Sequence, residues 1–225
     1  QSVKNTADGS VTFAALTYDQ NEVGKTYHYT IKEMKDSDTV NYTYDTITYK
    51  YEVFIDDVNG ALTIQVTDQT EYTEGRTPAE GAGNNASVVS MNFVNYYRAK
   101  GGFELTASKS VENREAAVSP NEFTFEVYEV IGGQLGETPV TSASTSAGGS
   151  VTFSDFAEDY FQITDGTTDD QLSKLLGEHV YIVREQVPAA GDDNYDSELI
   201  YSGQVYKVTV TVSDNRNGTL AVTEP

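Results

Sequence analysis

Residues 27–33 read Tyr27-His28-Tyr29-Thr30-Ile31-Lys32-Glu33, and apolar and polar side chains alternate along them. Every second residue from Tyr27 to Ile31 is apolar and falls on one face of an extended chain. Such alternation indicates a half-buried β-strand. The same pattern predicts further strands at Val11–Phe13, Thr48–Ile55, Ala61–Val66, Val89–Tyr97, Phe103–Lys109, Glu122–Val130, Val151–Phe153, Val180–Glu185, Val205–Val212 and Thr219–Thr223.

Turn signals separate these strands, and helix signals are scarce. Asn59-Gly60 and Asn217-Gly218 are pairs that accept the positive φ angles of a tight hairpin. One short helix is predicted over residues 169–177, where leucines recur with helical spacing and Gly177 ends the turn. Many short strands with turns between them predict an all-β protein built as a β-sandwich.

The chain also repeats itself, in the same order in both copies. Three stretches of the first copy return in the second, and the repeat is about 140 residues long. The pairs are Gly9-Ser10-Val11-Thr12-Phe13 with Gly149-Ser150-Val151-Thr152-Phe153, Tyr29-Thr30-Ile31-Lys32-Glu33 with Tyr181-Ile182-Val183-Arg184-Glu185, and Tyr49-Lys50 with Tyr206-Lys207. We expect two modules, 1–98 and 99–225, joined near Gly101-Gly102.

Each copy of the repeat lacks strands that the other copy has. The second copy has two strands upstream of Val151, at 103–109 and 122–130, for which the first has no counterpart. The first copy ends with a strand at 89–97 that the second lacks. Two readings remain open: the chain is a window cut from a longer array of repeats, or subunits complete one another by lending strands.

Composition excludes several classes of function. The 14 Lys and Arg against 35 Asp and Glu give a net charge of −21, which opposes binding to nucleic acid and to anionic lipid. There is no cysteine, which removes disulfides, thiolate catalysis and thiolate metal sites. No apolar stretch approaches the roughly 20 residues that a membrane helix needs. Acidic turns such as 56–60 and 214–218 resemble hairpins rather than calcium loops, so we expect no metal site.

Four polar residues stand where the alternation would place apolar ones. On the apolar face of its strand, Lys109 follows Leu105 and Ala107, and Asn95 follows Met91 and Phe93 on theirs. A glutamate, Glu33 or Glu185, takes the corresponding position at the end of the same strand in both copies. Burying such groups singly would cost several kcal/mol each. Their recurrence at corresponding depths suggests that they meet. The plainer alternatives are that Lys109 ends its strand and reaches into solvent, that Asn95 is a turn residue before the joint, and that Glu33 and Glu185 are exposed charges at strand ends.

These motifs, in this order, resemble the streptococcal-type pilin isopeptide-linkage domain, one of the CnaB-like, immunoglobulin-like modules of Gram-positive surface proteins. The resemblance covers nearly the whole chain in one and a half copies. It implies two tandem immunoglobulin-like modules, with the short helix inserted in the second. It also implies that Lys109 and Asn95 each form a spontaneous Lys–Asn isopeptide bond, assisted by Glu185 and Glu33 respectively.

The chemistry needs no cofactor. A lysine attacks only as a neutral amine, which an apolar environment favours, and a protonated glutamate can bind the carboxamide, polarise it and shuttle protons as ammonia leaves. The reaction happens once per module, so the chain is expected not to be an enzyme. Neither copy holds a complete set of reacting groups: Lys4 is a poor substitute for the missing lysine, and Lys109 and Asn95 are not expected to pair with each other.

The resemblance therefore implies a structural module of a cell-wall-anchored stalk, pilus or adhesin outside a Gram-positive cell. Its partners would be neighbouring repeats or subunits of the same fibre. An alternative is an adhesin domain that recognises a host receptor through the loop 67–87 or through the insertion 159–177.

Overall fold

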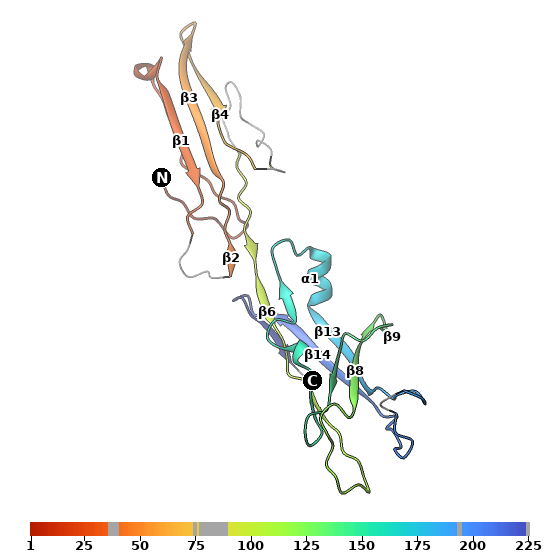
Figure 1. The fold of residues 1–225 in the computed structure, drawn as a ribbon. Helices are drawn as coiled ribbons and strands as arrows, with labels where there is room; N and C mark the ends of the chain where they lie inside the picture. Colours follow the sequence, from red (N-terminus) through yellow and green to blue (C-terminus); the bar gives the residue numbers. More distant parts are fainter. Residues whose placement is uncertain (36–40, 74–75, 77–89, 193–194, 224–225) are drawn as a thin grey trace. The chain divides into compact units, whose positions relative to one another are not determined.

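The computed structural model describes residues 1–35, 41–73, 76, 90–192 and 195–223 (Figure 1). The chain divides into two compact units. Unit 1 comprises residues 1–36 and 44–95, and unit 2 comprises residues 37–43 and 96–225. Both units are built of strands, which confirms the predicted all-β class, and the described residues contain one α-helix. Within these ranges no helix is long and apolar enough to cross a membrane.

Unit 1 is organised around one antiparallel sheet in the order β1-β3-β4 (Figure 1). Along β3 every second side chain is buried, from Tyr49 to Ile55, as a strand with one covered face requires. Asn59 and Gly60 take positive φ angles of 57° and 83° in the β3–β4 hairpin, as predicted. The strands of this sheet are β1 (Thr26–Lys32), β3 (Thr48–Val58) and β4 (Ala61–Asp68), and a 3-10 turn, η1 (Gln20–Glu22), precedes β1.

Unit 2 contains a larger antiparallel sheet, in the order β10-β8-β13-β14-β15, with β9 beside β8. Three short strand pairs accompany it: β11 with β7, β12 with β6, and β2 with β5. The strands are β2 (Tyr42–Thr43), β5 (Tyr96–Tyr97), β6 (Ala99–Gly101), β7 (Thr106–Ser108), β8 (Thr124–Ile131), β9 (Gln134–Leu135), β10 (Thr141–Ser144), β11 (Ser150–Thr152), β12 (Phe161–Ile163), β13 (Gly177–Glu185), β14 (Val205–Asp214) and β15 (Leu220–Thr223).

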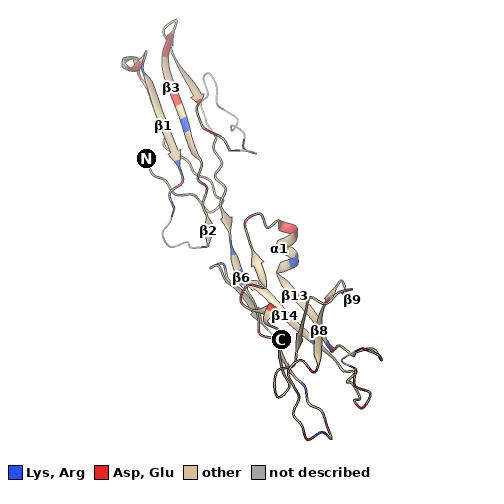
Figure 2. Cartoon of the chain, viewed as in Figure 1, with Lys and Arg blue, Asp and Glu red and all other residues tan. Residues whose placement is uncertain are grey.

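The predicted helix is present as α1 (Asp169–Leu175), and a 3-10 turn, η2 (Ser154–Phe156), precedes β12. Thr168 caps α1 in a reciprocal pair of hydrogen bonds with Gln171. The acidic first turn and the basic Lys174 in the last turn both suit the helix dipole (Figure 2). The leucines of this segment are partly buried against the core of unit 2, so the inserted segment covers part of that core.

The sequence repeat is also a structural repeat. The arrangement β1-β3-β4 in unit 1 matches β13-β14-β15 in unit 2. The turn at 6–10 has the same hydrogen bonds as the turn at 146–150: in each, the amide of the first residue donates to the carbonyl of the last, and the glycine amide donates back to the carbonyl of the first. The second Asn-Gly turn differs from the prediction. Gly218 has a positive φ angle, but the other positive φ angle in this turn belongs to Arg216 and not to Asn217.

Some predicted strands are shorter or missing. Residues 11–13 are not a strand and Val11 is 46% exposed, whereas its counterpart Val151 is 1% exposed and pairs with Ala107 of β7. The described residues of unit 1 offer Val11 no strand equivalent to β7, so its backbone has no ladder to join. Within the predicted strand 89–97, the described residues pair only at β5, and most of the loop 67–87 lies outside the described residues.

Residues 96–98 are held by contacts within unit 2. The hydroxyl of Tyr97 donates to Asp214 at 2.9 Å and accepts from the amide of Gly218 at 3.0 Å. The guanidinium of Arg98 binds the carboxylate of Asp165 with two nitrogens. This pair holds the pKa of Asp165 below its ordinary value.

Candidate functional site

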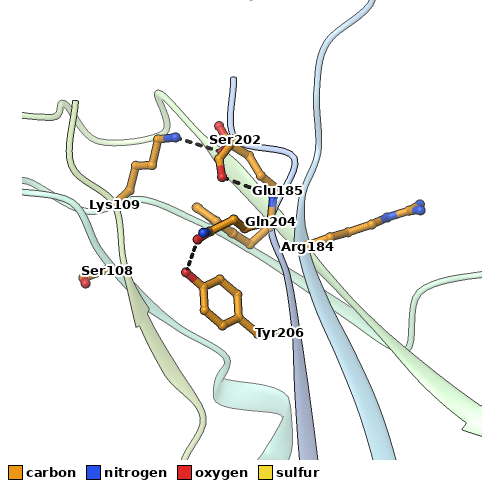
Figure 3. Close-up of a pocket in the computed structure, with 8 residues that line it drawn as sticks. Ser108, Lys109, Arg184, Glu185, Ser202, Gln204 and Tyr206 are labelled. Carbon is orange, nitrogen blue, oxygen red and sulfur yellow. Dashed lines mark hydrogen bonds and ion pairs between the residues drawn. The ribbon is translucent and has the colours of Figure 1, made fainter. Parts of the chain in front are cut away.

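Lys109 and Glu185, predicted to meet, form an ion pair in unit 2. Lys109 directly follows β7, Glu185 ends β13, and Nζ of the lysine lies 2.8 Å from Oε2 of the glutamate (Figure 3). The side chains are 12% and 2% exposed. The pair is therefore shielded from water, and the predicted solvent-facing alternative is wrong for these two residues.

The surroundings of Lys109 fix its direction. The ring centre of Phe123 lies 4.5 Å from Nζ, a cation–π contact. The amide of Lys109 donates to the carbonyl of Gly149, whose φ is +89°. A Cβ at that glycine would overlap the backbone oxygen of Lys109, so glycine is required where the two segments touch.

A small cleft opens beside the ion pair (Figure 3). The second oxygen of Glu185, Oε1, is buried and has no hydrogen-bond partner among the described residues. A buried carboxylate oxygen without a partner is costly, so this atom is suited to receive a donor. The cleft is lined by Ser108, Lys109, Phe125, Arg184, Glu185, Ser202, Gln204 and Tyr206.

Glu33 and Asn95 also meet, in unit 1. Asn95 donates through Nδ2 to Oε1 of Glu33 at 2.6 Å. Glu33 is half-buried, one residue beyond β1, and Asn95 is exposed. The other oxygen of Glu33, Oε2, is buried and again lacks a partner among the described residues. Unit 1 thus brings a carboxamide to the glutamate, as unit 2 brings an amine.

A turn before β3 holds the other end of the Asn95 carboxamide. The backbone amide of Asp45 donates to Oδ1 of Asn95 at 2.8 Å. The Asp45 carboxylate in turn accepts from the amide of Val94 at 2.8 Å and from that of Ile47 at 2.9 Å, and pairs with Arg76 at 2.7 Å. Burial opposes ionisation of Asp45, but these donors outweigh it and leave its pKa below the ordinary value of 3.8.

Sequence reasoning missed Asp45 and Phe123. Asp45 lies outside the predicted strands, so alternation along a strand gives no sign of it. Phe123 reads as an ordinary core residue, and it is 4% exposed. A signal for the turn does exist: Tyr44-Asp45 stands before β3 as Tyr201-Ser202 stands before β14.

The acidic clusters have other roles. Asp165 binds Arg98, and Asp169 and Asp170 form the first turn of α1. Among the described residues no group of three His, Cys, Asp or Glu side chains is placed to hold a metal ion.

A family model described as FctA, a Spy0128-like isopeptide containing domain, matches residues 1–98 and 105–224. The chain belongs to the FctA family. The two matched segments confirm the resemblance and fit two tandem immunoglobulin-like modules. No curated protein and no solved structure matches the chain. FctA domains are structural rather than enzymatic, and they are extracellular components of the pili of Gram-positive bacteria, where they associate with other pilus subunits.

Proposed function

We propose that the chain is a load-bearing segment of a pilus or related surface fibre, with modules 1–98 and 99–225 each closed by a Lys–Asn isopeptide bond. Lys109 and Asn95 are the reacting residues, and Glu185 and Glu33 assist them. One observation carries this proposal. Glu185 binds an amine and Glu33 binds a carboxamide, and each has a second, buried oxygen for which the described residues provide no hydrogen-bond partner.

The two half-sites are complementary. Because Glu33 and Glu185 occupy the same position in the repeat, one site supplies what the other lacks. If the two half-sites were combined in one module, a single glutamate carboxylate would bind the lysine amine with one oxygen and the asparagine amide nitrogen with the other. Such placement replaces a bimolecular encounter by a high effective concentration.

The reaction balances without a cofactor. The lysine first gives a proton to the glutamate across the ion pair and becomes a neutral amine. Nζ attacks Cγ of the asparagine, a bond forms between these atoms, and the bond from Cγ to Nδ2 breaks. The glutamate supplies a proton to Nδ2 and recovers one from Nζ, so that ammonia leaves and the carboxyl group takes part as a proton carrier.

Each half-site needs a third group. By the register of the repeat, the asparagine that serves Lys109 and the lysine that serves Asn95 both fall outside residues 1–225. A longer array supplies them from the same module, whereas strand exchange would supply them from another chain. Either source leaves the chemistry at Lys109 and Asn95 unchanged.

The proposed bonds have a mechanical consequence. Cross-linking the first and last strands of a module closes a long loop, and by analogy with a disulfide a loop of 100 residues contributes about 4.7 kcal/mol. Tension along the chain would then pass through a covalent bond instead of a strand ladder. A protein without cysteine gains this reinforcement independently of an oxidising compartment.

Intact-mass spectrometry tests the proposal. A chain extended at both ends through the neighbouring strands is expected to lose one ammonia per module. Glu185→Ala removes the loss in the second module only, and Glu33→Ala removes it in the first only. A full calculated mass for the extended chain would refute the proposal.

A further inference from the structure

The carboxamide of Asn95 is oriented by two contacts of opposite kind. A backbone N–H can only donate, so the atom facing the amide of Asp45 has to be Oδ1. Nδ2 then faces Glu33, which accepts from it. Glu33 therefore serves the leaving nitrogen, and the carbonyl oxygen is bound by Asp45 instead.

The turn that carries this amide is locked in place. The Asp45 side chain is 5% exposed and bridges Ile47, two residues on, to Val94, which precedes the asparagine. The backbone amide of Asp45 thus donates to the side chain of Asn95, and the Asp45 carboxylate accepts from the backbone amide of Val94, the residue before Asn95. An amide held by its surroundings needs no reorganisation when charge develops on its partner.

The equivalent segment of unit 2 shares one of these hydrogen bonds. The hydroxyl of Ser202 accepts from the amide of Gln204 at 3.2 Å, as the Asp45 carboxylate accepts from the amide of Ile47. Ser202 lines the cleft beside Lys109 and Glu185 (Figure 3). An asparagine entering that cleft would meet the Ser202 turn as Asn95 meets the Asp45 turn.

We propose that the backbone amide of Asp45, and in unit 2 that of Ser202, binds the oxyanion that forms when lysine attacks the asparagine carbonyl. The inference rests on the proposed isopeptide reaction and deepens it. When Nζ bonds to Cγ, the carbonyl electron pair moves onto Oδ1, and the amide hydrogen bond stabilises that negative charge. As the pair returns, the bond to Nδ2 breaks and ammonia leaves. The Asp45 side chain is a positioning group, since it touches neither reacting atom.

An amide-to-ester replacement isolates the backbone donor. In the extended chain, the α-hydroxy analogue of aspartate at position 45 removes the N–H and keeps the carboxylate. The rate of ammonia loss in the first module should fall roughly 10²-fold or more, as for the loss of an oxyanion donor in enzymes. The matched control is the hydroxy analogue at Thr46, whose amide has no acceptor within the described part of the chain; its rate should stay unchanged. Hydroxy analogues at Ser202 and Gly203 form the corresponding pair in the second module.

A second readout needs no cross-linking. In the chain of residues 1–225, the Asp45 amide proton should resonate downfield and exchange slowly, and Asn95→Ala should abolish both effects. An extended chain that reacts equally fast with the ester at 45 overturns the inference while the isopeptide reaction stands. An extended chain that never loses ammonia overturns the proposed function, and the inference falls with it. An Asp45 proton unaffected by Asn95→Ala overturns the inference alone.

Discussion

Nζ of Lys109 and Oε2 of Glu185 lie 2.8 Å apart and join two different sheets of unit 2. β7, which leads to the lysine, pairs with β11, whereas β13, which ends at the glutamate, lies within the larger sheet. The ion pair is thus a cross-sheet contact at the edge of the core, where a covalent bond to a third strand would tie the layers together.

Removing the lysine should destabilise unit 2. Lys109→Met leaves the buried Glu185 without a cation, and we expect a loss of about 3–5 kcal/mol in the free energy of unfolding of the 1–225 chain, measured in urea. The double variant Lys109→Met, Glu185→Leu should recover most of this loss, because no charge remains buried. Lys174→Met, in an exposed pair with Asp170, is the control and should change little. Equal losses in the single and double variants would contradict this expectation.

The glycine turn beside Lys109 offers a matched pair of variants. Gly148 and Gly149 both have positive φ, but only at Gly149 would a Cβ meet backbone, the carbonyl of Lys109. Gly148→Ala should cost about 1–2 kcal/mol through its φ alone. Gly149→Ala should cost clearly more and also slow cross-linking at Lys109, because the lysine's backbone has to move. Equal unfolding midpoints for the two variants would argue against this contact.

Acid should weaken unit 1 through Asp45. Its pKa is depressed in the folded state, so its contribution to stability is complete above the unfolded value of 3.8 and is lost as the pH falls through the lower folded value. Asp45→Ala should lower the stability of unit 1 by about 1–3 kcal/mol at neutral pH, because the partly buried amide donors of Ile47 and Val94 lose their acceptor. The variant should also show a shallower loss of stability below pH 4 in acid titrations followed by circular dichroism. A variant with an unchanged acid titration would exclude Asp45 as the responsible group.

Tyr97 should anchor its segment to unit 2. Tyr97→Phe leaves the amide of Gly218 and the carboxylate of Asp214 without their shared partner, and we expect a loss of about 1–2 kcal/mol. Tyr96→Phe is the control, since Tyr96 is 45% exposed. Hydrogen exchange at Gly218 should accelerate in the first variant and remain unchanged in the second; equal rates in both would contradict the assignment.

The sequence predicted the parts of this structure that depend on periodicity. Alternation placed Glu33 and Glu185 at equivalent strand ends, and both meet a predicted partner of the right chemistry. It could not predict that Val11 would remain outside a strand, because strand formation there depends on a hydrogen-bonding partner such as β7 provides for Val151. Nor could it find the Asp45 turn, whose contacts run through backbone amides that every residue but proline possesses.

Peptide mapping of the extended chain tests the proposed cross-link most directly. After proteolysis, tandem mass spectrometry should find a branched peptide in which the Lys109 side chain is joined to an asparagine side chain, lighter by one ammonia than its two linear parts. A corresponding branched peptide should contain Asn95, and both should vanish when the glutamate of their own module is replaced by alanine. Recovery of Lys109 and Asn95 only in linear, unmodified peptides, at full sequence coverage, would contradict the isopeptide function.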